Sequence, residues 1–162
     1  MKSNLIVILL AVGAVSVIGV MAYQGLPNKN ATETLSEAKG IAATLYKSPS
    51  CGCCGQYSAY LGEEGYGVEV KLEQDMSAIK ERFSVPYELE SCHTMEVGGY
   101  VVEGHVPEAA IEKLLTERPD IKGIGMGGMP SGSPGMPGPK NGDFVIYEIN
   151  HDGTRGAVFI TI

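Results

Sequence analysis

The chain concentrates sulfur in one short segment. Cys51, Cys53 and Cys54 supply three of its four cysteines within the run Cys-Gly-Cys-Cys, which follows an apolar stretch. Cys51 and Cys54 alone have the C-x-x-C spacing of a thiol redox site or of half a metal site. Disulfide exchange requires only two thiols. The additional sulfur of Cys53 therefore favours a soft metal ion as the ligand of this segment.

The fourth cysteine, Cys92, lies far along the chain in Ser91-Cys-His-Thr94, and we expect folding to bring it beside the other three. Disulfides explain the pattern less well, because pairing Cys51 with Cys54 and Cys53 with Cys92 would crosslink one tight loop twice. Structural zinc, the alternative metal, more naturally uses two separated C-x-x-C pairs. Bridging thiolates suit Cu(I), so we predict a multinuclear Cu(I) site formed by Cys51, Cys53, Cys54 and Cys92.

A second soft element lies in residues 123–140, a segment rich in glycine and proline. We expect this segment to form neither a helix nor a central strand. Its methionines can either hold the loop against the body or reach the metal with their thioethers. They are therefore further candidate ligands: Met126, Met129 and Met136.

The histidines complete the candidate ligands. In an extended loop the ring of His93 would point away from the sulfur of Cys92, whereas His105, just before a predicted helix, suits a capping or packing role. Both are kept as candidate metal ligands, and Glu103 could orient His105. His151 lies in a turn, where we expect it to be solvated.

The hydrophobic pattern predicts alternating strands and helices around these residues. The order is β-α-β-α-β-α, followed by a C-terminal β-hairpin. The expected strands are 41–47, 68–72 and 96–103, and the hairpin pairs 144–149 with 157–162. The expected helices begin at Cys54, at Asp75 or Ser77, and at Pro107.

This α/β order, with a C-x-x-C pair at the start of the first helix, resembles the thioredoxin/glutaredoxin architecture. The resemblance implies that helix-terminal N–H groups stabilise thiolates there. It also implies that the loop entering the third strand, which usually carries a cis-proline, runs beside them. Cys92 occupies that loop in this sequence, so a sulfur replaces the proline.

The amino terminus differs in character from the rest of the chain. Residues 5–22 carry no charge and approach the roughly 20 residues of a membrane-spanning helix, so we expect a cleaved signal peptide or a retained anchor within 1–23. Residues 24–39 suit a linker, and 40–162 suit one folded domain. Either alternative predicts a periplasmic or otherwise extracytoplasmic protein, with a tether to the inner membrane if the apolar helix is kept.

Charge excludes one class of partner. The chain carries 12 Lys and Arg against 19 Asp and Glu, and no basic cluster is visible. Nucleic acid is therefore not an expected partner.

Four ordered motifs resemble signatures of the CopG-type copper-resistance family. They are Cys51-Gly-Cys-Cys54, Ser91-Cys-His-Thr94, Val102-Glu-Gly-His-Val-Pro107 and Gly128-Met-Pro-Ser-Gly-Ser-Pro-Gly-Met136. The resemblance covers nearly all of the chain from Ile41 onward. It implies a thioredoxin-like fold and an exported protein that binds copper through the four cysteines.

We expect a metal-binding protein rather than an enzyme, one that sequesters Cu(I) and contributes to copper resistance. Copper ions are its expected ligand, with copper efflux or copper-resistance proteins as candidate partners. Two alternatives remain: a thiol–disulfide oxidoreductase that uses Cys51 and Cys54, and a copper oxidoreductase that interconverts Cu(I) and Cu(II).

Overall fold

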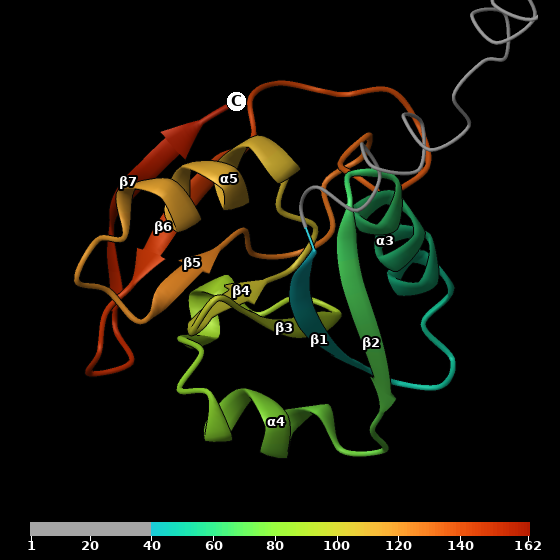
Figure 1. Cartoon of the computed structure of the whole chain (residues 1–162), viewed down its shortest axis with the longest axis horizontal. Coiled ribbons are helices and arrows are strands. Elements are labelled where there is room, and N and C mark those ends of the chain that lie inside the picture. Colours follow the sequence, from blue (N-terminus) through green and yellow to red (C-terminus); the bar gives the residue numbers. More distant parts are fainter. Residues whose placement is uncertain (1–39) are drawn as a thin grey trace, which may run out of the picture. The chain divides into compact units, whose positions relative to one another are not determined.

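The structure, a computed structural model, describes residues 40–162 (Figure 1). The predicted apolar helix at 5–22 and the linker at 24–39 lie outside the described residues. Within 40–162, no helix combines the length and the apolar character needed to cross a bilayer.

The described part is a mixed α/β fold built on a seven-stranded sheet, which confirms the predicted α/β class. Its thioredoxin-like assignment stays a prediction. The strands are β1 (Ile41–Lys47), β2 (Tyr66–Leu72), β3 (His93–Val97), β4 (Tyr100–Glu103), β5 (Gly123–Gly125), β6 (Val145–Ile149) and β7 (Arg155–Thr161). The helices are α3 (Gly52–Glu63), α4 (Met76–Arg82) and α5 (Glu108–Glu117), with a short 3-10 turn η1 at Tyr87–Leu89.

The strands are arranged in the order β2-β1-β3-β4-β5-β6-β7. Strands β1 and β2 run parallel, as do β4 and β5, and the other neighbours are antiparallel. The last two strands, β6 and β7, form the predicted C-terminal hairpin.

Helices cover both faces of the sheet (Figure 1). Successive residues of a strand point to opposite faces. Leu45 accordingly packs into a core with Leu61 of α3 and Ile111 of α5, whereas its neighbour Tyr46 packs with Ile79 of α4. The side chain of Asp75 caps α4 by accepting hydrogen bonds from the backbone N–H groups of Ser77 and Ala78. Of the two residues predicted to start this helix, Asp75 and Ser77, Asp75 is therefore the N-cap.

Two strand predictions were wrong. The single strand expected over 96–103 is a hairpin, because Gly98 and Gly99 have φ angles of 56° and 89° and reverse the chain between β3 and β4. The segment 123–140, expected to lack a central strand, contributes β5 between β4 and β6. Glycine allows this pairing, since a Cβ on Gly123 would lie 1.9 Å from the backbone oxygen of Val101.

The strand register brings the functional segments to one end of the sheet. Lys47, the last residue of β1, pairs with His93, the first residue of β3. Thr94 pairs with Glu103, and Glu103 pairs in turn with Gly125. The residues just after β1, β4 and β5 therefore gather beside those just before β3.

Candidate metal site

The three clustered cysteines lie at the amino end of α3. Cys51 is the N-cap residue, and no side chain there satisfies the free N–H groups of the first turn. Such N–H groups and the helix dipole favour a thiolate. Cys54 is fully buried, while Cys51 and Cys53 are half-buried.

Cys51 and Cys54 are joined by a disulfide, and Cys53 and Cys92 are free. The cysteine spacing favours four free thiols over disulfides, and this expectation is wrong for one pair. Of the two disulfides considered as the alternative, Cys51–Cys54 is formed and Cys53–Cys92 is not. The Sγ atoms of Cys53 and Cys92 are 4.0 Å apart and not bonded.

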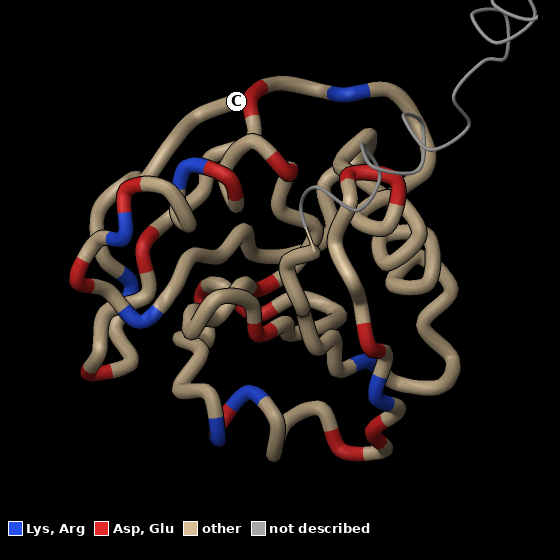
Figure 2. Tube along the Cα trace, viewed as in Figure 1, with Lys and Arg blue, Asp and Glu red and all other residues tan. Residues whose placement is uncertain are grey.

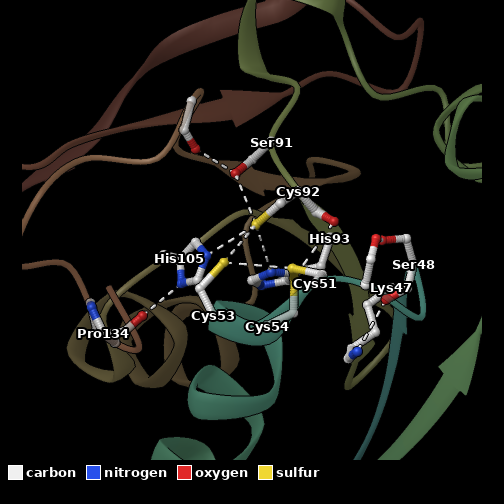
Figure 3. Close-up of a disulfide and its surroundings, with 12 residues drawn as sticks. Lys47, Ser48, Cys51, Cys53, Cys54, Ser91, Cys92, His93, His105 and Pro134 are labelled. Carbon is white, nitrogen blue, oxygen red and sulfur yellow. Dashed lines mark hydrogen bonds between the residues drawn. A yellow bond between two sulfur atoms is a disulfide. The ribbon is translucent and has the colours of Figure 1, made fainter. Parts of the chain in front are cut away.

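All four sulfurs nevertheless converge, which confirms the expected position of Cys92 (Figure 3). The Sγ atoms of Cys51, Cys53, Cys54 and Cys92 all lie within 4.8 Å of one another. Cys51 and Cys53 are 3.5 Å apart. Four soft donors at this spacing can share one ion or bridge several.

Both candidate histidines lie against Cys92, and both side chains are fully buried. The Nε2 atom of His105 is 3.0 Å from the sulfur of Cys92, and the Nδ1 atom of His93 is 3.5 Å from it. The expectation that His93 would point away was wrong. Because His93 belongs to β3 rather than to a loop, its ring packs on that of Tyr57, with centroids 4.6 Å apart.

The hydrogen bond of His105 to Pro134 fixes its tautomer. The carbonyl of Pro134 can only accept, so Nδ1 of His105 carries the proton and donates across 2.6 Å. In the neutral ring the lone pair then lies on Nε2, facing Cys92. The Nε2 atom of His93 is buried without a hydrogen-bond partner among the described residues. Cys92, His93 and His105 thus form a second cluster of donors suited to a metal.

Burial sets the protonation of these groups. It raises the pKa of the Cys92 thiol from 9.0 to about 11, and the nearby Cys53 adds to the shift. Burial also lowers the pKa of His93 well below its ordinary value, with help from His105 and Lys80, and lowers the pKa of His105. At neutral pH both rings are neutral and can act as ligands, whereas a metal must displace the thiol proton.

The methionines lie in different environments. Met129 is exposed and lines an open pocket of about 570 Å³ together with Cys92. Met136 lines a second pocket of about 580 Å³ together with Cys53. Met126 is buried in the core. Two of the three candidate methionines therefore share a pocket with a cysteine, Met129 with Cys92 and Met136 with Cys53.

Glu103 does not orient His105 as expected. Its buried carboxylate forms an ion pair with Lys80 of α4 and accepts hydrogen bonds from Ser91 and Thr94. Burial raises its pKa, and Lys80 opposes that shift. The role of Lys80 was not predicted from the sequence, because this cation becomes buried only when the chain folds. The one local signal of a buried ion pair was Glu103, a carboxylate at the end of the apolar strand Tyr-Val-Val-Glu.

The remaining ionisable residue considered from sequence, His151, is exposed and lies 3.1 Å from Asp120, away from the cysteines. Lysines, arginines and acidic residues are interspersed along the described part of the chain, which shows no basic cluster between residues 40 and 162 (Figure 2).

The fold and these donors define an α/β protein with a sulfur-rich candidate metal site. The family described as "Protein of unknown function, DUF411" matches residues 89–136, which include Cys92, His93 and His105. No curated protein matches the sequence.

Two solved structures resemble the chain closely. One, "Copper resistance protein copG- Form 2", is 38% identical, with a TM-score of 0.70, and covers 76% of this chain and 99% of its own. Form 1 of the same protein is also 38% identical, with a TM-score of 0.69, and covers 76% of this chain and 98% of its own. The chain belongs to the CopG copper-resistance family.

Proposed function

We propose that this protein binds and sequesters Cu(I) through Cys51, Cys53, Cys54 and Cys92, and so contributes to copper resistance. The observation that carries the proposal is the convergence of four sulfurs within 4.8 Å. Its relatives are named as copper-resistance proteins. Thiolates favour Cu(I) and can bridge several ions, which suits a multinuclear site.

The neighbouring donors add to the fit. The Nε2 atom of His105 and the Nδ1 atom of His93 lie beside Cys92 and offer further ligands. Met129 and Met136 offer thioethers in the two pockets that Cys92 and Cys53 line. Imidazole and thioether both bind copper. Met126, being in the core, is the weakest candidate of this set.

Full loading of the site requires prior reduction. The disulfide between Cys51 and Cys54 must take up two electrons and two protons to give two thiols. Before that step, Cys53 and Cys92 are the only free thiols among the described residues. The copper capacity of the protein therefore depends on the redox state of this pair.

Anaerobic reconstitution with Cu(I), after reduction and followed by metal analysis, tests the proposal. A Cys53→Ser/Cys92→Ser double variant should lose most of the bound copper, whereas a Ser50→Ala variant beside Cys51 should keep it. Equal copper in the double variant and in the wild type would refute ligation by this cluster.

We also propose a cellular location for the protein. An uncharged segment at 5–22 supports export to the periplasm, with anchoring if the segment is retained. The cysteines at a helix start support a thioredoxin-like fold, and copper efflux or resistance proteins are candidate partners. Fractionation of cells that express the full chain would test its location.

A second function, thiol–disulfide exchange, is favoured by the disulfide in the C-x-x-C pair. It predicts that the reduced protein turns over a model disulfide and that Cys92→Ser retains this activity. No turnover by the fully reduced protein would remove this candidate. Interconversion of Cu(I) and Cu(II) at the same cluster remains the third candidate, tested by reaction of the loaded protein with an oxidant.

A further inference from the structure

We propose that Glu103 is a positioning residue, which holds Cys92 and His93 against the helix-start cysteines by fixing both ends of their segment. The inference rests on the proposed function in one respect: Cys92 is taken as a copper ligand. The geometry that supports it belongs to the protein itself.

The two carboxylate oxygens of Glu103 bind on either side of the pair Cys92-His93. Oε1 accepts a hydrogen bond of 2.7 Å from the backbone N–H of Ser91. Oε2 accepts one of 2.6 Å from the hydroxyl of Thr94. One side chain thus restrains the residues that directly precede and follow Cys92-His93.

Lys80 completes this arrangement from α4. Its ammonium group forms an ion pair with Oε1 and lies 3.4 Å from the Thr94 hydroxyl. The side chain of Glu103 is 0% exposed and that of Lys80 is 7% exposed, so water screens the pair weakly. Hydrogen bonds to an ionised carboxylate are stronger than those to a neutral group, which strengthens the hold on Ser91 and Thr94.

The residue after Glu103 contributes to the same restraint. The N–H of Gly104 donates to the carbonyl of His93 across 3.1 Å. A Cβ at Gly104 would lie 2.8 Å from the Cβ of Ser91, so only glycine lets the two segments approach this closely. Residues 103 and 104 therefore contact the Cys92 segment at Ser91, His93 and Thr94.

A purely stabilising role explains this arrangement poorly. A buried ion pair adds little net stability, because desolvation offsets the attraction and apolar residues of similar volume often serve as well. The hydrogen bonds of this carboxylate go to Lys80 and to the two flanks of Cys92-His93. A positioning role explains why the Glu103 carboxylate is buried despite the desolvation cost, and why its hydrogen bonds go to the residues on either side of Cys92-His93.

Two double variants separate the positioning hydrogen bonds from the buried charge. Lys80→Met/Glu103→Met removes both, and Lys80→Met/Glu103→Gln removes the charge but keeps an amide oxygen that can accept from Ser91. Leu114→Ala, in a buried part of α5, controls for lost stability. The readout in the reduced, metal-free protein is the alkylation rate of Cys92 relative to Cys53, measured by mass spectrometry.

We expect Lys80→Met/Glu103→Met to raise the relative rate at Cys92 by about tenfold, as the loss of a hydrogen bond of ordinary strength implies. Its Cu(I) affinity should fall by a similar factor. The glutamine variant should stay within about threefold of wild type in both respects, and Leu114→Ala should change neither. If the methionine variant fails to fold, Thr94→Val replaces it, with an expected rise of about threefold.

Equal behaviour of the methionine and glutamine variants would overturn the proposal, as would an equal change in Leu114→Ala. The alkylation arm needs no metal. If the wild-type protein bound no Cu(I) but the variants showed the expected differences in alkylation rate, the copper function would be refuted and the positioning role of Glu103 would stand.

Discussion

The two sides of the candidate site are built in different ways. On the helix side, Cys51, Cys53 and Cys54 are close because they are neighbours in sequence, and no side chain caps the helix there. On the strand side, Cys92 reaches the site only through the pairing of β1, β3 and β4 and is surrounded by buried polar groups. The helix side brings three cysteines together because they are neighbours in sequence. The strand side contributes one cysteine, which the strand pairing holds in place.

This difference has a functional meaning. Loss of one helix-side sulfur leaves two others beside it, so the site can partly compensate. Loss of Cys92 leaves no other cysteine on its side among the described residues, where the imidazoles of His93 and His105 are the neighbouring donors. The strand side should therefore be more sensitive to substitution than the helix side.

The largest effect on copper binding is expected for Cys92→Ser. It should lower Cu(I) affinity on the order of 100-fold, against roughly tenfold for Cys51→Ser, the factors that correspond to about 2.8 and 1.4 kcal/mol. Competition with a chromophoric Cu(I) chelator in anaerobic reducing buffer measures both. Losses of equal size would show that the two sides are equivalent.

Backbone fit on the strand side is tested by Gly104→Ala. Its φ is +80°, and the added Cβ would lie 2.5 Å from the carbonyl oxygen of Met126, so we expect a loss of about 2–4 kcal/mol of unfolding free energy. Gly99→Ala is the matched control, since Gly99 has φ +89° but no atom within 4 Å of the added Cβ. Its expected cost is about 1–2 kcal/mol. Urea denaturation measures both, and equal costs would contradict the close approach.

Acid should weaken the metal-free protein through its buried histidines. The pKa values of His93 and His105 are lowered in the folded state, so below the ordinary histidine pKa of 6.5 the unfolded chain binds protons that the folded chain does not. Stability is therefore complete above that pH and falls as pH decreases, by at most about 1.4 kcal/mol per pH unit for each histidine. Glu103, whose pKa is raised, opposes part of this loss.

Urea denaturation between pH 7.5 and 5.5 measures the effect. His93→Phe, which can keep the contact with Tyr57, should reduce the pH dependence relative to wild type, and the exposed control His151→Gln should leave it unchanged. An unchanged slope in His93→Phe would show that this ring carries none of the effect.

The smallest effects are expected at the methionines. Met129→Leu and Met136→Leu should each lower Cu(I) affinity by no more than about threefold, because leucine keeps the volume and removes only the thioether. Met126→Leu, in the core, should leave affinity unchanged. A larger loss in Met126→Leu than in the other two would contradict the placement of these side chains.

The helix side of the site could be predicted from sequence, and the strand side only in part. The spacing of Cys51 and Cys54 and the apolar strand before them are local patterns, so the helix start was predictable. The expectation that Cys92 lies beside them rested on the resemblance to the thioredoxin architecture. The orientation of His93 depends on where β3 begins, and the burial of Lys80 depends on how α4 packs, so neither could be inferred from local pattern.

The hairpin between β3 and β4 and the short strand β5 were missed for a related reason. Each depends on glycines that reverse the chain or allow close pairing, and hydrophobic periodicity does not reveal such positions. Glycine pairs in an apolar run are the local signal that could have indicated the hairpin.

The most direct test of the central claim is X-ray absorption at the copper edge, combined with copper per protein, on the reduced and anaerobically loaded chain. If the four cysteines form one Cu(I) site, the protein should bind more than one copper with mainly sulfur neighbours, and Cys92→Ser should reduce both copper content and sulfur coordination. A single copper with nitrogen or oxygen neighbours, unchanged in Cys92→Ser, would contradict the claim.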